Sequence, residues 1–153
     1  MKKTLLIIAA FVFLFTACDD EEVQLSYEDQ LAVDIKKIED YLAKNDLTAQ
    51  SLESGLHYII EVEGTGNHPT VDSTVTVKYT GKLLDGKVFD SGTIETELTN
   101  LILGWRKGIP LFKEGGSGIL FIPSSMGYGI YGSPSVPENA VLIFDIELLE
   151  VSN

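Results

Sequence analysis

Few side chains in this chain stand at spacings that support covalent, metal or phosphate chemistry. His57 lies in an expected strand and His68 precedes Pro69 in an expected loop, so packing or surface roles are expected for both histidines. Ser117 and the pair Ser124-Ser125 have no base nearby in the sequence and are typical of turns. The sequence also has no Gly-rich phosphate loop, no HExxH pair and no nucleophile elbow. An enzyme built on this sequence therefore has to work without a metal, a cofactor or a covalent nucleophile.

Length and charge narrow the class of protein further. A chain of 153 residues has room for one ordinary domain and a short appendage. Its hydrophobic fraction of 44% is ordinary for a globular protein. The formal net charge of −12 repels a phosphate backbone, because nucleic-acid binding relies on Lys and Arg to displace counterions. Nucleic acid is therefore excluded as an expected partner.

The first residues have the pattern of an export signal. A basic start, Met1-Lys2-Lys3-Thr4, precedes an apolar run from Leu5 to Phe15. That run is shorter than the roughly 20 residues of a membrane-spanning helix, so residues 1–17 are predicted to be a secretory signal peptide. The ending Leu14-Phe15-Thr16-Ala17-Cys18 resembles a bacterial lipobox. We expect acylation of Cys18 and a lipid anchor on the periplasmic face or the cell surface; the alternative is a plain signal with an incidental cysteine.

A helical spacer is predicted between this signal and the rest of the chain. After the acidic run Asp19–Glu22, Ser26 can cap a helix that Asn45 ends. One face of this helix carries apolar residues at spacings of four, three and four, namely Leu31, Ile35, Ile38 and Leu42. The stripe could pack on its own domain or pair with a second copy. Self-packing and a monomer are favoured, because so short a seam makes a weak coiled coil. Residues 46–55 are read as a linker, so that residues 18–55 form an anchor, linker and spacer.

The remaining residues, 56–153, are predicted to form one α+β domain. The expected strands are Leu56–Val62, Thr74–Leu84, Lys87–Phe89, Gly118–Ile122 and Val141–Glu150. A short helix is expected at Leu101–Lys107, bounded by Pro110. Since one short helix cannot cover both faces of such a sheet, we expect a twisted antiparallel sheet wrapped around the helix.

Five segments of this β-rich region carry a family resemblance. They are Val77-Lys78-Tyr79-Thr80-Gly81, Leu84 to Ser91, Leu101-Ile102-Leu103-Gly104-Trp105, Ile122-Pro123 with Gly127-Tyr128-Gly129, and Leu142 to Leu148. In order and approximate spacing they resemble the signature of FKBP-type peptidyl-prolyl cis-trans isomerases. The fold of that family, a twisted sheet curled around a short helix, agrees with the pattern of strands.

The resemblance implies a proline-binding pocket and a role for each residue in it. Trp105 would be the floor, and Tyr79, Phe89 and Phe144 the walls. The backbone N–H of Ile102 and the hydroxyl of Tyr128 would hold substrate carbonyls. Asp90 would lie at the rim, held by the Tyr79 hydroxyl. The further lining residues would be Leu101 and Val136. From periodicity alone, each apolar residue of the set reads as ordinary core.

The chemistry implied by the resemblance needs no metal or cofactor. Rotation about an X-Pro bond breaks amide conjugation against a barrier of about 20 kcal/mol. A dry, apolar pocket favours the twisted transition state over the more polar planar amide. The expected function is isomerisation of proline-containing polypeptides during the folding of exported proteins. The alternative is a catalytically weak module that binds proline-containing segments or partner proteins. The resemblance also implies binding of macrolide immunosuppressants.

Departures from the family pattern fall on one pocket wall. The stretch from Thr93 to Asn100 is short and lacks the aromatic residue that precedes the helix in the family; Thr96 or Leu98 falls nearest its place. Ser135, within the flap at residues 130–138, stands where a bulky aliphatic residue often lines the pocket. We therefore expect a thinner wall and leave the catalytic strength open.

Overall fold

The structure is a computed structural model that describes residues 25–152. The predicted signal peptide, Cys18 and the acidic run Asp19–Glu22 lie outside the described residues. No helix within residues 25–152 combines the length and apolar character needed to cross a membrane.

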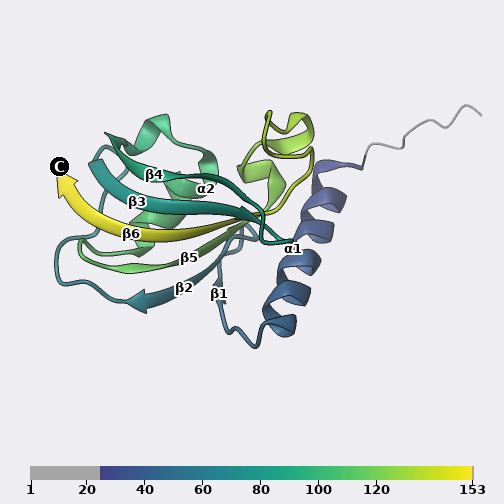
Figure 1. Cartoon of the computed structure of the whole chain (residues 1–153), viewed down its shortest axis with the longest axis horizontal. Coiled ribbons are helices and arrows are strands. Elements are labelled where there is room, and N and C mark those ends of the chain that lie inside the picture. Colours follow the sequence, from purple (N-terminus) through teal and green to yellow (C-terminus); the bar gives the residue numbers. More distant parts are fainter. Residues whose placement is uncertain (1–24, 153) are drawn as a thin grey trace, which may run out of the picture.

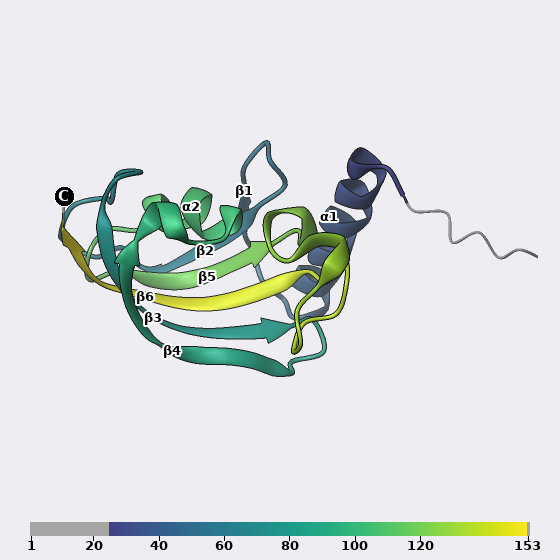
Figure 2. The ribbon, with the colours of Figure 1, turned by 90° about the horizontal axis from the view of Figure 1, so that it is seen from above.

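A six-stranded antiparallel sheet forms the body of the molecule (Figure 1). Its strands lie in the order β1-β2-β5-β6-β3-β4. Their bounds are β1 Gln50–Ser51, β2 His57–Val62, β3 Thr74–Leu83, β4 Val88–Glu97, β5 Ser117–Ile122 and β6 Leu142–Ser152. The sheet is strongly curved and wraps around the short helix α2, Leu103–Gly108 (Figure 2). This arrangement confirms the predicted fold class.

The concave side of the sheet holds the main hydrophobic core. Val75 and Val77 of β3 are fully buried there, and alternate residues of β6 point to the same side. Those residues of β6 are Leu142, Phe144, Ile146 and Leu148. The alternating apolar residues of β3 and β6 therefore face the core as predicted, because successive side chains of a strand face opposite sides of the sheet.

Helix α1, Tyr27–Lys44, covers one end of the opposite face of the sheet (Figures 1 and 2). Its N-cap Ser26 accepts a hydrogen bond from the Asp29 amide at 3.1 Å, as expected of a capping serine. Ile38 and Leu42 are buried in a second, smaller core together with Phe121 of β5 and Ile143 of β6. The apolar stripe thus packs on its own domain, which confirms the favoured use of it.

Two strands differ from their sequence-based expectation. β4 continues to Glu97, well beyond the predicted Phe89, because Ser91–Glu97 pair residue by residue with β3. β1 lies inside the segment read as a linker, where Gln50 accepts a 3.0 Å hydrogen bond from the Tyr58 hydroxyl of β2. Both segments are polar, so their own sequences lack the alternating apolar pattern that predicts a strand. Pairing with the neighbouring strand stabilises them instead.

Short 3-10 turns connect these elements. They are η1 Leu98–Asn100, η2 Ile109–Leu111, η3 Ser124–Met126 and η4 Gly129–Tyr131. η1 leads into α2 and η2 follows it directly, with Pro110 in its first turn. η3 and η4 follow β5 and enclose Tyr128.

Candidate functional site

A cavity of about 190 Å³ opens on the concave side of the sheet, beside α2. The residues that line it are Tyr79, Asp90, Ile94, Asn100, Leu101, Ile102, Trp105, Tyr128 and Phe144. Pockets for drug-sized ligands span about 300–1,000 Å³. This cavity is smaller and suits a single ring or side chain.

Three aromatic rings form the bottom of the cavity, and two of them, Tyr79 and Phe144, stand nearly perpendicular to the third, Trp105. The Trp105 ring centroid lies 5.1 Å from that of Tyr79 and 5.1 Å from that of Phe144, at interplanar angles of 83° and 84°. Trp105 is only 3% exposed. Edge-to-face pairs of this kind are a favoured aromatic arrangement, so the rings hold one another in place.

Glycines allow these rings to come together. A Cβ atom at Gly104 would lie 2.4 Å from Cγ2 of Ile122, so only glycine lets α2 approach β5 closely enough to set Trp105 in the floor. On β3, a Cβ atom at Gly81 would lie 2.6 Å from Cζ of Phe89 and 2.8 Å from Cε1 of Phe144. The floor and its support therefore depend on two positions without side chains.

A carboxylate and a phenol meet at the rim of the cavity. The Tyr79 hydroxyl donates a 2.8 Å hydrogen bond to Oδ2 of Asp90, between the neighbouring strands β3 and β4. Burial, and then the hydrogen bond to Asp90, raise the pKa of Tyr79 to about 12. Burial and the charge of Asp90 also raise the pKa of Tyr128. Both phenols thus stay protonated and can donate hydrogen bonds at neutral pH.

Two hydrogen-bond donors belong to residues that line this cavity and have no acceptor among the described residues. Ile102 precedes α2 in extended geometry, and its carbonyl accepts from Trp105 N at 3.0 Å and Arg106 N at 3.1 Å. Within residues 25–152, neither the Ile102 N–H nor the Tyr128 hydroxyl donates to another protein group. Both donors are therefore available to the carbonyl groups of a bound ligand.

The structure brings almost all of the residues predicted for the pocket to this cavity. Phe89 and Val136 are set apart from the lining. The Phe89 ring contacts two lining rings, with its centroid 5.5 Å from that of Phe144 and 6.4 Å from that of Tyr128. Val136 is 2% exposed and belongs to the main core beside the site.

Two lining residues, Ile94 and Asn100, were not predicted. Ile94 shares a face of β4 with Asp90, four residues earlier, so recognition of the full strand would have found it. Leu98, one of the two candidates for the missing aromatic, is fully buried in the core. Ile94 provides the wall instead. Among the described residues, no three His, Cys, Asp or Glu side chains gather as a metal site would require.

Comparisons with known proteins agree with this geometry. The profile of the FKBP-type peptidyl-prolyl cis-trans isomerases matches residues 65–149. The FKBP-type peptidyl-prolyl cis-trans isomerase FkpA of Aeromonas hydrophila is 44% identical over 123 residues, which are 76% of this chain and 46% of the relative. FkpA of Escherichia coli K12 is 41% identical over 103 residues, covering 64% of this chain and 38% of the relative.

Solved structures are similar as well. The crystal structure of FkpA from Escherichia coli has a TM-score of 0.71 at 35% identity and covers 82% of this chain and 62% of that one. A peptidyl-prolyl cis-trans isomerase from Pseudomonas syringae pv. tomato has a TM-score of 0.71 at 30% identity, with 85% and 98% covered. The matched region spans less than half the length of the curated relatives.

Proposed function

This chain belongs to the FKBP-type peptidyl-prolyl cis-trans isomerases, and from that premise we propose that it catalyses rotation about X-Pro bonds in polypeptides. The observation that carries the proposal is an aromatic floor beside two hydrogen-bond donors that bond to no group among the described residues. The proline ring packs against Trp105, between Tyr79 and Phe144. The Ile102 N–H and the Tyr128 hydroxyl hold the neighbouring carbonyl groups.

The proposed catalysis follows from the polarity of the amide. A planar X-Pro amide is conjugated and charge-separated, whereas the twisted transition state is less polar. A cavity lined mainly by apolar rings therefore favours the twisted form, and only such a difference between the two states raises the rate. Each stabilisation of about 1.4 kcal/mol of the transition state accelerates rotation tenfold. No bond is broken, and no proton is transferred.

Asp90 is the one charged group in the lining. The hydrogen bond from Tyr79 fixes its orientation at the rim. Its carboxylate acts electrostatically on the amide as conjugation is lost and charge redistributes. Because electrostatic groups work best when they are already oriented, the Tyr79 hydroxyl is part of the proposed machinery.

The substrates that we propose are proline-containing segments of exported proteins during folding. The sequence supports this through the predicted export signal and the lipobox-like ending at Cys18, which would hold the domain outside the cytoplasm. Spontaneous isomerisation takes tens to hundreds of seconds, so folding chains there benefit from a catalyst.

The test is cis-trans exchange of a Leu-Pro or Phe-Pro peptide with micromolar full-length chain in detergent micelles. We expect exchange faster than in micelles alone. The chain has one tryptophan, Trp105, so peptide binding can be followed separately by fluorescence. A change in Trp105 emission on binding without acceleration would contradict catalysis and leave a binding module.

A further inference from the structure

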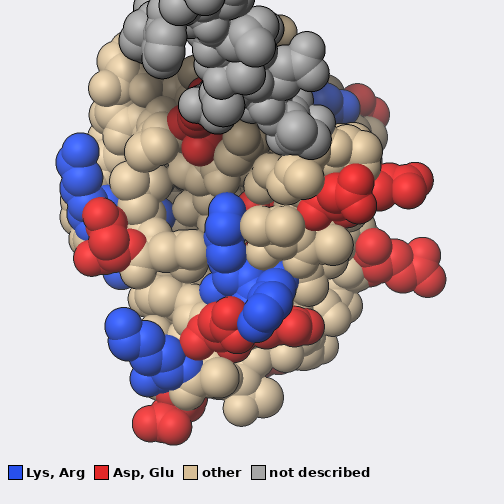
Figure 3. Space-filling model, turned by 90° about the vertical axis from the view of Figure 1, so that its right-hand side faces the viewer, with Lys and Arg blue, Asp and Glu red and all other residues tan. Residues whose placement is uncertain are grey.

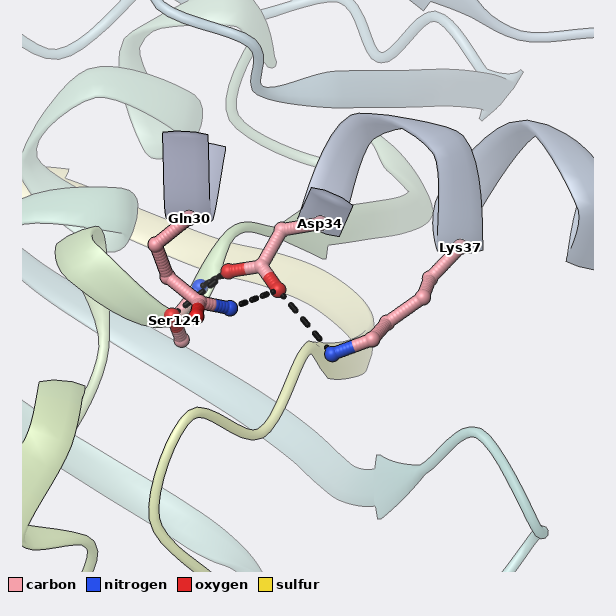
Figure 4. Close-up of polar contacts among 4 residues, drawn as sticks. All are labelled: Gln30, Asp34, Lys37 and Ser124. Carbon is pink, nitrogen blue, oxygen red and sulfur yellow. Dashed lines mark hydrogen bonds and ion pairs between the residues drawn. The ribbon is translucent and has the colours of Figure 1, made fainter. Parts of the chain in front are cut away.

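Asp34 on α1 is a fully buried carboxylate whose main partner lies 90 residues away in the sequence. Its Oδ2 accepts from the Ser124 N–H at 2.8 Å and from the Ser124 hydroxyl at 2.5 Å. Its Oδ1 accepts from Nε2 of Gln30 at 2.9 Å and lies 3.3 Å from Nζ of Lys37 (Figure 4). All four groups are donors, so the carboxylate is paired on both oxygens.

This pairing specifies one arrangement of α1 on the domain. A buried carboxylate is unfavourable unless hydrogen bonds and opposite charge replace its hydration. Here they come from the helix itself and from Ser124, which is 1% exposed. If α1 shifted, both the carboxylate and the Ser124 amide would lose their partners. The contact between Asp34 and Ser124 therefore fixes the position of α1 relative to η3, and we call it the joint.

The joint lies at the start of the segment that carries Tyr128. Ser124 opens η3, and the turn is closed by hydrogen bonds from Met126 N to Pro123 O at 3.0 Å and from Gly127 N to Ser124 O at 2.9 Å. Met126 is buried in the main core. Tyr128 follows directly and lines the cavity. A displacement of Ser124 would thus move the Tyr128 hydroxyl.

Packing contacts fix helix α1 on the domain, so that Asp34 can hold Ser124 in one position. Ile38 and Leu42 are buried against β5 and β6. Near the other end of the helix, a Cβ atom at Gly55 would lie 3.0 Å from both Ile35 and Leu31, so the loop before β2 also packs on α1. The helix is held on both sides of Asp34.

We propose that Asp34 is a positioning residue of the isomerase site: from α1 it holds Ser124 and thereby sets the Tyr128 hydroxyl over the cavity. The predicted spacer helix is then part of the working domain. The inference rests on the proposed isomerase function. It differs from a purely stabilising role, because it requires the effect of Asp34 to pass through Tyr128.

A double-mutant cycle in the full chain tests this requirement. We expect Asp34→Ala to lower kcat/KM about 5- to 10-fold, within the range of measured couplings between linked residues. In a Tyr128→Phe background the same change should lower it less than about 2-fold, because the positioned hydroxyl is already gone. Equal fold-losses in both backgrounds would overturn the proposal.

Asp40→Ala is the matched control. Asp40 lies on the same helix, but its side chain is 67% exposed and, among the described residues, its ion pair is with Lys36 at 2.9 Å. On this side of the molecule acidic and basic side chains lie next to one another (Figure 3). A change in one exposed acid leaves that pattern nearly intact, so Asp40→Ala should retain wild-type kcat/KM.

Two alternative variants and one spectroscopic measurement complete the test. Should Asp34→Ala fail to fold, Asp34→Asn and Ser124→Ala remove parts of the joint and should show the same dependence on Tyr128. The ring resonances of Tyr128 in the tyrosine-labelled chain should shift in Asp34→Ala and not in Asp40→Ala. This readout is independent of turnover, so it decides the inference even if the wild type proves inactive, and unchanged Tyr128 resonances would overturn it.

Discussion

The Tyr79 hydroxyl donates a 2.8 Å hydrogen bond to Asp90, joining a ring of the aromatic floor to the charge at the rim. The two residues lie on adjacent strands, where Gly81 of β3 pairs with Asp90 of β4. The sheet therefore aligns an apolar surface and an oriented carboxylate around one cavity. The proposed catalysis depends on both the apolar surface and the oriented carboxylate.

Removal of this hydrogen bond should weaken catalysis more than it weakens the fold. Tyr79→Phe keeps the ring that packs on Trp105 and frees the Asp90 carboxylate to rotate. We expect the loss of Asp90 orientation to remove about 1.4 kcal/mol of transition-state stabilisation, which is a tenfold loss in kcat/KM. Peptide exchange kinetics measure it. Tyr58→Phe, which removes a hydroxyl at the β1 edge, is the control. Wild-type kcat/KM for Tyr79→Phe would contradict the role of Asp90 orientation.

The two phenols should not make catalysis depend on pH from about 6 to 9, because both have raised pKa values and remain protonated.

The stability of the fold should depend on pH at higher values. The pKa of Tyr79 is raised from 10.0 to about 12, mainly by burial. A raised pKa in the folded state gives a stabilisation that is complete below pH 10 and is lost as the pH rises towards 12.

Denaturant midpoints between these pH values measure that loss. Tyr79→Phe should show a smaller decline with pH than the wild type, since it has no phenol to ionise at this position. An equal decline in both proteins would mean that other groups account for the alkaline sensitivity.

Ile94 should supply the wall where the family pattern lacks its aromatic residue. Ile94→Ala opens the cavity towards β4, so we expect a higher KM for the peptide, by about threefold, with kcat less affected. It should also lower the free energy of unfolding by about 1–3 kcal/mol, since the side chain is only partly buried. Thr96→Ala, on the same face of β4 but outside the lining, is the matched control. Equal KM values in the two variants would contradict a wall at Ile94.

The lipid anchor that we propose at Cys18 can be tested independently of the fold. Cys18→Ser removes the thiol that would be acylated, so we expect the variant protein to leave the membrane fraction of the producing bacterium. Fractionation and immunoblotting measure this. Retention of the variant in membranes would contradict acylation at Cys18.

Sequence patterns were sufficient to predict the elements that bury one face, because burial of one face gives apolar residues a regular spacing. The alternation of Val75 and Val77 in β3, and the apolar stripe of α1 that includes Ile38, follow directly from which faces are buried. The family resemblance, and not the apolar pattern alone, predicted that Tyr79 and Trp105 share one cavity, and both line it.

What the sequence could not predict depends on distant partners. The second half of β4 is polar and is held by its pairing with β3, so neither the strand nor Ile94 within it was expected. In the sequence, Asp34 looks like any acidic residue on the surface of a helix. Its partner Ser124 lies 90 residues later, and only the fold brings the two together. Local patterns contain no information about such a joint.

Whether this cavity performs the isomerisation can be decided by one comparison of rates. Exchange of a Leu-Pro peptide is compared for the wild type and for the combined variant Phe89→Ala with Asp90→Ala, after both are shown to be folded. We expect clear acceleration by the wild type and a rate close to the uncatalysed one for the variant, because we propose that this cavity catalyses the rotation. Full activity in the variant would contradict it.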